Sequence, residues 1–187
     1  MKTLMIAFSW CLVAGVMFHG ALALDGIPEG TELVKISKER VPMDLRLVTL
    51  CVSMDGVVGP HDAAEVNVYV NDQVIDYRKK NPEDFDYPVG SVFVKEKFPS
   101  VGAAEPDLAT IMVKKKDEGH VSDWEFSMVS LPDREPVRPN ASVSCADCHE
   151  RYEERGYISK KSEELLLKFI GIEGRSGGVD DAGVADE

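Results

Sequence analysis

Cysteine is scarce in this sequence, with only four among 187 residues. A small domain held together by disulfides needs a higher density, so a disulfide scaffold is excluded. Cys11 lies in the amino-terminal apolar segment, and we interpret Cys51 as a small buried apolar residue. The remaining two, Cys145 and Cys148, stand three positions apart and are followed at once by His149.

Basic residues are also few, because 21 lysines and arginines face 33 aspartates and glutamates, giving a formal net charge of -12 at pH 7. So acidic a chain is not expected to bind nucleic acid or an anionic membrane surface. If its partners are charged, we expect them to be basic.

Long apolar runs are missing except near the amino terminus, where residues 1–23 have the features of an export signal. Met1-Lys2 is a basic start, residues 4–18 are mostly apolar, and Ala21-Leu22-Ala23 fits a small-x-small cleavage site. The apolar segment is short for a membrane span, and an uncleaved anchor is the alternative. We expect a periplasmic mature chain that begins near Leu24 and has no membrane association.

The mature chain has the length of one domain. We assign residues 24–174 to it, because residues 175–187 are rich in glycine and acidic residues and are predicted to be a disordered tail.

Cys145, Cys148 and His149 form a C-x-x-C-H motif, which is typical of covalent haem attachment. Each thiol can add to one vinyl group, and the histidine can become the proximal iron ligand. We therefore predict one covalent haem c, bound by both cysteines and ligated by His149. The alternatives are a redox dithiol, a plain disulfide, or half a zinc site completed by Cys51, His61 or His120.

The 38 residues after His149 contain no methionine or histidine, so a sixth iron ligand must come from upstream or be absent. The upstream candidates are Met43, Met54, Met112, Met128, His61 and His120. We expect absence, which leaves an iron position open to a small molecule. A six-coordinate electron carrier is the alternative function, and a haem-free zinc or dithiol module is another.

Apolar and polar residues alternate with the period of a strand over residues 66–70, 91–98, 108–114 and 124–129. Short connections between them favour an antiparallel meander. A short helix is expected over 72–78, whereas residues 33–52 fit either a helix or a strand. After His149 the helix is expected to continue to Gly156, and a second helix should begin at Ser159 or Ser162. Its predicted apolar side is Leu165, Leu166, Phe169 and Ile170. The fold class is therefore α+β, a mainly antiparallel sheet with a few helices and a carboxy-terminal haem-attachment helix.

Several short segments, each weak alone, occur in a fixed order along the mature chain. They are Val41-Pro42 through Leu50-Cys51, Gly59-Pro60-His61, Val68-Tyr69-Val70-Asn71, Pro88-Val89-Gly90-Ser91-Val92-Phe93-Val94-Lys95-Glu96, Ile111-Met112-Val113-Lys114 and Asp123-Trp124-Glu125-Phe126. Together with the late C-x-x-C-H motif, this order resembles the cytochrome P-460 family.

The resemblance implies a homodimer with haem on the Cys145, Cys148 and His149 motif, and chemistry on small nitrogen compounds. Family enzymes that oxidise hydroxylamine join a lysine to the porphyrin edge, and Lys95 corresponds to it. Lys97, on the same strand face, is the fallback, and a solvated strand lysine is the structural alternative. The redox partner of such an enzyme would be a basic cytochrome.

Relatives called cytochrome c′-beta share the fold and resemble nitric oxide binders, with phenylalanine over the iron. Phe85, Phe93 and Phe98 are the candidates for such an apolar cap. The distal carboxylate of the oxidising members has no assigned counterpart, because the connector before the motif ends in Asn140. The usual Asp-Tyr-Val-Phe after the motif is replaced by Gly156-Tyr157-Ile158-Ser159.

Overall fold

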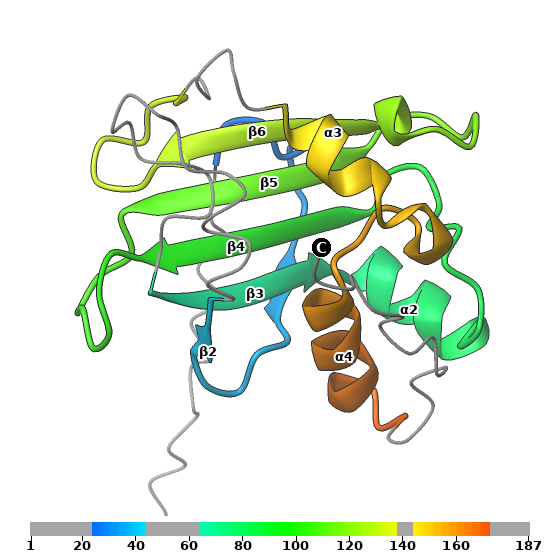
Figure 1. Cartoon of the computed structure of the whole chain (residues 1–187), viewed down its shortest axis with the longest axis horizontal. Coiled ribbons are helices and arrows are strands. Elements are labelled where there is room, and N and C mark those ends of the chain that lie inside the picture. The colour runs from blue at the N-terminus through cyan, green and yellow to red at the C-terminus, as the bar shows by residue number, and fades with distance from the viewer. Residues whose placement is uncertain (1–23, 44–63, 138–143, 173–187) are drawn as a thin grey trace, which may run out of the picture.

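The computed structural model describes residues 24–43, 64–137 and 144–172 (Figure 1). The predictions for the signal peptide, Cys51, Met54, His61, Asn140 and the acidic tail lie outside these residues. None of the helices in the described ranges is long and apolar enough to span a membrane.

A six-stranded antiparallel sheet forms the centre of the described fold. Its strands are β1 (Leu33–Lys35), β2 (Val41–Pro42), β3 (Glu65–Asn71), β4 (Val92–Phe98), β5 (Leu108–Lys114) and β6 (Trp124–Ser130). The order is β1-β3-β4-β5-β6, and β2 also pairs with β3. Strands β3, β4 and β5 each pair with the next strand along the chain, which confirms the meander and the α+β class.

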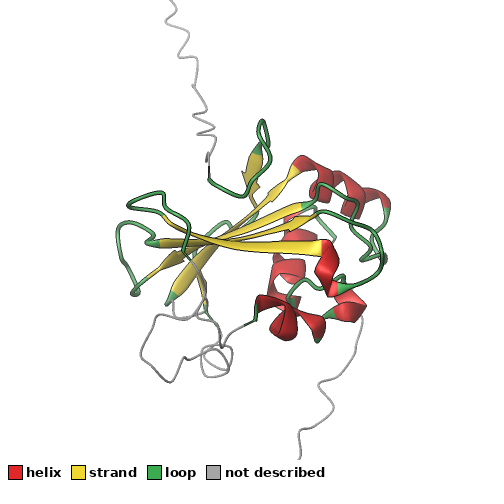
Figure 2. Ribbon diagram, turned by 90° about the horizontal axis from the view of Figure 1, so that it is seen from above, coloured by secondary structure: helices red, strands yellow, loops and turns green. Residues whose placement is uncertain are grey.

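Three helices gather at one end of this sheet, as Figure 2 shows. They are α2 (Asp72–Lys80), α3 (Cys145–Glu150) and α4 (Lys160–Phe169), with the 3₁₀ turns η1 (Val121–Asp123) and η2 (Glu153–Arg155). Asn71 precedes α2, but its side chain donates to Gly90 O and accepts from Val92 N instead of capping the helix. It therefore ties the end of β3 to the start of β4.

The predicted length of the haem-attachment helix was wrong, because α3 ends at Glu150 and not at Gly156. The α-helix is capped at Arg151, and Tyr152, with φ -104° and ψ 22°, leaves α-helical geometry, so that residues 153–155 form the 3₁₀ turn η2. Gly156 and Tyr157 then have positive φ, 57° and 68°. The chain turns back here, so that Tyr157 reaches the underside of α3.

The two faces of the sheet bury separate apolar clusters, as expected from the alternation along each strand. Val68, Val70 and Phe93 pack with α2 and α4, whereas Val92 and Val94 pack on the opposite face. The first cluster anchors α4 through Leu166, which is completely buried. These contacts fix α4 against the sheet.

The predicted apolar side of α4 was only partly right, because Phe169 is 40 % exposed. The buried side of the helix includes two polar residues, Ser162 and Glu163. Glu163 meets the fully buried Arg78 of α2, with 3.2 Å between Nη2 and Oε2, and it also accepts a hydrogen bond from Tyr87. The buried side of α4 therefore makes long-range polar contacts as well as apolar ones.

Asp123 closes the turn between β5 and β6. Its Oδ2 accepts hydrogen bonds from the backbone N–H groups of Glu118, Gly119 and His120, at 2.8, 2.8 and 3.2 Å. Burial alone would raise the pKa of Asp123, but these three donors lower it below its usual 3.8. The turn matters for the site because Gly119 O accepts the Tyr157 hydroxyl at 2.9 Å.

We predict that Asp123→Asn destabilises the fold by about 2 kcal/mol at neutral pH, as expected when a buried charge-assisted hydrogen-bond set is lost. The pKa of Asp123 is lower in the folded protein than in the unfolded chain. The charged carboxylate therefore adds to the free energy of unfolding above about pH 4, and this contribution is lost as the pH falls through the folded pKa. Urea unfolding at several pH values tests this prediction. The difference in the free energy of unfolding between wild type and variant should disappear below about pH 4. A gap that stays constant with pH would contradict the role assigned to the charge.

Candidate haem site

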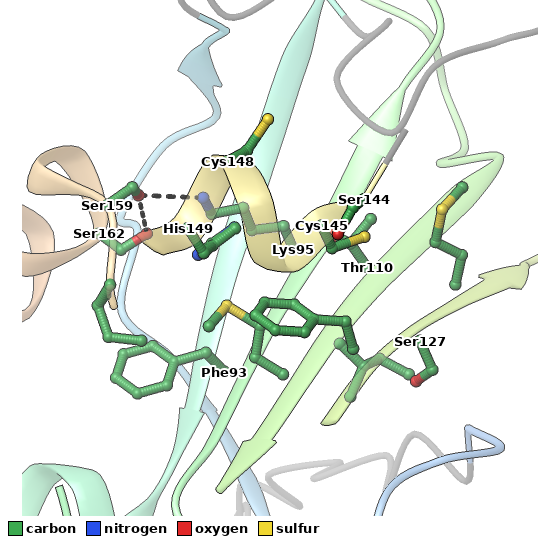
Figure 3. Close-up of a pocket in the computed structure, with 15 residues that line it drawn as sticks. Phe93, Lys95, Thr110, Ser127, Ser144, Cys145, Cys148, His149, Ser159 and Ser162 are labelled. Carbon is green, nitrogen blue, oxygen red and sulfur yellow. Dashed lines mark hydrogen bonds between the residues drawn. The ribbon is translucent and has the colours of Figure 1, made fainter. Parts of the chain in front are cut away.

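A cavity with an empty volume of about 630 Å³, part of it open to solvent, lies between the sheet and helices α3 and α4 (Figure 3). Its lining joins residues from β4, β5, β6, α3 and the start of α4. They are Phe93, Lys95, Thr110, Ile111, Met112, Phe126, Ser127, Met128, Ser144, Cys145, Cys148, His149, Ile158, Ser159 and Ser162.

The floor of the cavity follows from strand register. Phe93 pairs with Met112, and Met112 pairs with Phe126, giving one row across three strands. The next row on the same face is Lys95, Thr110 and Met128. One amine therefore stands in a surface made mostly of apolar and thioether side chains.

Helix α3 brings both cysteines and the histidine to this cavity. Ser144 caps the helix, its Oγ accepting from Asp147 N at 3.3 Å. Positions three and four residues apart lie on one side of a helix, so Cys145, Cys148 and His149 share a face. All three line the cavity, and no disulfide joins the two cysteines. Burial raises the pKa of the Cys145 thiol.

The His149 ring is held by the turned-back chain. Nδ1 lies 2.7 Å from Tyr157 O, and because a carbonyl only accepts, Nδ1 carries the proton and donates. Burial lowers the pKa of His149 to about 4, so the ring is neutral and Nε2 holds a lone pair. Phe126 packs against the ring at 5.0 Å between centroids. This is the tautomer that a histidine needs in order to ligate a metal through Nε2.

Gly156 makes this arrangement possible, because a Cβ at this position would collide with the Phe85 carbonyl oxygen. We predict that Gly156→Ala destabilises the protein by more than the roughly 1–3 kcal/mol of a left-handed non-glycine residue. Gly171→Ala is the matched control, since Gly171 has φ 77° but nothing within 4 Å of the added methyl. Thermal unfolding of both variants isolates the clash, and equal losses would contradict it.

Lys95 projects into the cavity, where its Nζ donates to Ser159 Oγ at 3.2 Å (Figure 3). Ser159 Oγ in turn lies 2.9 Å from Ser162 Oγ. Burial lowers the pKa of Lys95 to about 8. Lys97 is on the same strand face and 1 % exposed, but it does not line the cavity. Lys95 is therefore the better placed of the two candidate lysines.

The described upstream candidates for a sixth iron ligand differ in whether they line the cavity. Met112 and Met128 line the cavity, Met43 packs against the core, and His120 precedes η1. Both cavity methionines sit on the face of Lys95 in the neighbouring strands, so strand alternation with the correct register would have found them. Sequence reasoning could not supply the register.

Of the three candidate capping phenylalanines, only Phe93 lines the cavity. Phe85 packs under the Arg78 guanidinium, and Phe98 lies under Arg40. Phe126, which contacts His149, was missed because its strand gave no sign of facing the motif. Among the described lining residues there is no aspartate or glutamate.

The residues present suit haem. Two thiols for thioether bonds, a neutral imidazole with its Nε2 available, and a mostly apolar cavity are the groups that a covalently attached haem requires. The site is less suited to a metal ion bound by side chains alone. Among the described residues, no three histidine, cysteine, aspartate or glutamate side chains are grouped so that they could hold a metal ion.

Comparison with curated proteins finds no match. The family model for cytochrome P460 matches residues 52–159, more than half of the chain and including the whole C-x-x-C-H motif. The chain therefore belongs to the cytochrome P460 family, and its cofactor is haem.

Proposed function

We propose that this protein is an exported c-type cytochrome that acts on a small nitrogen compound at an open iron position. Cys145 and Cys148 would attach a single haem, and His149 would ligate its iron. The observation that carries the proposal is that Cys145, Cys148 and the Tyr157-anchored His149, all from the short helix α3, line one cavity.

When bound, haem supplies an iron that takes a small ligand and exchanges electrons. The chain supplies the surroundings: Tyr157 O fixes the orientation of His149, and Phe93 and Phe126 keep the cavity apolar. An apolar lining excludes water and strengthens the electrostatic interactions inside the site.

Oxidation of hydroxylamine is the first candidate reaction, and the position of Lys95 in the cavity supports it. A bond from Lys95 to the porphyrin edge would remove one hydrogen from the amine and one from the ring carbon. The two electrons would pass to an oxidant such as a peroxide. Such a bond abolishes the charge of the lysine and distorts the macrocycle.

Nitric oxide binding without turnover is the second candidate, because the described part of the lining offers no carboxylate. Oxidation of hydroxylamine releases protons, a task for a general base. Met112 and Met128 in the cavity also keep a six-coordinate electron carrier among the alternatives to be tested.

Multiple-turnover oxidation of hydroxylamine by the holoprotein, with an artificial electron acceptor, tests the first candidate. Sustained acceptor reduction is the expected result. An inactive holoprotein that still binds nitric oxide would leave the second candidate, and a low-spin spectrum unchanged by nitric oxide would indicate the electron carrier.

We further propose that the protein works in the periplasm, as a homodimer, with a basic redox partner. The export features of residues 1–23 and the net charge of -12 support the location and the partner. The homodimer is supported by the family resemblance.

A further inference from the structure

A chain of aromatic rings leads away from the haem cavity. Phe93 lines the cavity, and its ring centroid lies 5.2 Å from that of Tyr87, with the planes at 80° (Figure 3 shows Phe93 at the cavity). The ring of Tyr87 lies 5.7 Å from that of Tyr77 on α2. Trp124 packs beside this chain, 6.0 Å from Phe93 and 6.5 Å from Tyr87. Tyr87 is 1 % exposed, whereas Tyr77 is only partly buried. The rings therefore lead from the wall of the cavity, through the buried Tyr87, to the partly exposed Tyr77.

Each tyrosine in this chain has its own carboxylate. The Tyr77 hydroxyl donates to Asp84 Oδ2 at 2.6 Å, and the Tyr87 hydroxyl donates to Glu163. A phenol that loses an electron becomes a strong acid, so an acceptor already in hydrogen-bond contact lowers the free-energy cost of its oxidation. Both tyrosines are thus arranged to lose an electron and a proton together.

The two carboxylates differ in their access to solvent, since Asp84 is exposed and Glu163 is buried. The hydrogen bond from Tyr77 holds the pKa of Asp84 below the usual value, so it is charged at neutral pH. Burial raises the pKa of Glu163, and the Arg78 guanidinium at 3.2 Å opposes that rise. A proton that moves to the exposed Asp84 can pass on to solvent, whereas one on the buried Glu163 cannot do so directly, so the outer tyrosine is the more favourable end point for a missing electron.

We propose that Tyr87 and Tyr77 carry oxidising equivalents from the cavity to the surface, an inference that rests on the haem function proposed above. An oxidant in the cavity takes an electron from Tyr87, and Tyr77 replaces it. Tyr77 ends one electron and one proton short, the proton having moved to Asp84. A small-molecule reductant in solution then returns the exposed Tyr77 radical to the phenol, and a second such oxidation completes the reduction of one molecule of hydrogen peroxide to two of water, with the protons drawn from solvent.

The route would protect the cavity. Met112 and Met128 line it, and oxidation would convert each thioether into a polar sulfoxide. An electron supplied from Tyr77 consumes the oxidant before it attacks these side chains. The cost is a radical at a partly exposed tyrosine, where reductants in solution can reach it.

Tyr69 offers a matched control within the same sheet. Its hydroxyl also donates to a carboxylate, Glu96 Oε2, at 2.7 Å. Tyr69 pairs with Val94 and packs with the cluster on the opposite face of the sheet from Phe93. Among the described residues it contacts no other aromatic ring, so it has the proton acceptor without the route.

The test treats holoprotein, checked by its Soret band, with hydrogen peroxide and a radical spin trap, and maps adducts and methionine sulfoxide by peptide mass spectrometry. Wild type should carry the adduct on Tyr77. Tyr87→Phe and Asp84→Asn should lose most of it and gain sulfoxide at Met112 and Met128. Tyr77→Phe gives the background level of labelling in the absence of the Tyr77 phenol. Tyr69→Phe should show the same Tyr77 adduct and the same methionine sulfoxide as wild type.

An undiminished Tyr77 adduct in both Tyr87→Phe and Asp84→Asn would overturn the route, as would equal labelling of Tyr69. So would an adduct confined to Tyr152, whose ring lies 5.9 Å from that of His149. Asp84 is exposed, so its variant keeps the test valid if Tyr87→Phe fails to fold. Wild-type protein without a Soret band would contradict both the haem function and the route. Wild-type protein with a Soret band but no adduct on Tyr77 would contradict the route alone.

Discussion

Protein with both Cys145 and Cys148 replaced by alanine is expected to leave a haem-c-competent periplasm without covalently bound haem. The reason is chemical, because each thioether bond needs its own sulfur and no other cysteine lines the described part of the cavity. Haem staining after denaturing electrophoresis measures the loss directly, since only covalently attached haem stays with the chain. Loss of the stain should be complete.

Cys51→Ala is the control for this experiment, because it removes the one other cysteine beyond residues 1–23 and leaves the motif intact. It should keep wild-type haem staining. Undiminished staining in the double variant would show that the motif does not attach the cofactor, and the proposed function would fall with it.

Lys95→Ala is expected to have the second largest effect, the loss of both hydroxylamine oxidation and the red-shifted ferrous Soret band of a lysine-linked haem. Lys95 is the amine that lines the cavity, and its pKa of about 8 leaves an appreciable fraction of the nitrogen uncharged near neutral pH. The optical spectrum is the decisive measurement, because the bond changes the intact mass by only a few hydrogens. The band of the variant should move to the position of an ordinary c-type haem.

Lys97→Met separates the two candidate lysines, since it removes the other amine on the same strand face while retaining most of the buried side-chain volume. The structure predicts an unchanged Soret band in this variant. If Lys97→Met loses the red shift and Lys95→Ala keeps it, the cross-linked residue is Lys97 and not Lys95. Identical ordinary spectra in wild type and Lys95→Ala would mean that no cross-link forms.

Much of the fold was accessible from the sequence because strand alternation is a local property. The strand expected over 108–114 is β5 as observed, and the alternation in β4 placed Phe93 and Lys95 on the face opposite Val92 and Val94. Helix ends were less accessible. The chain leaves α-helical geometry at Tyr152 and turns back at Gly156, which lies against the Phe85 carbonyl, a group distant in the chain.

The candidate site was accessible only in part. Lys95 could be named as a candidate, but its contact with Ser159 joins residues 64 positions apart. The buried pair of Arg78 and Glu163 spans 85 positions, and nothing local distinguishes either residue from a solvated helix charge. Such pairs exist because desolvated charges must find partners, and the partner is chosen by packing.

What the sequence determined by itself is the chemistry at one point of the chain: two thiols and an imidazole within a single helical turn, in an acidic protein. Only the tertiary structure decided what surrounds that point. It set the tautomer of His149 through Tyr157, brought Met112 and Met128 into the cavity, and separated Lys95 from Lys97. The physical reason is that spacing along a helix is set by local backbone geometry, whereas the surroundings of a cavity are set by strand register and by contacts between distant segments.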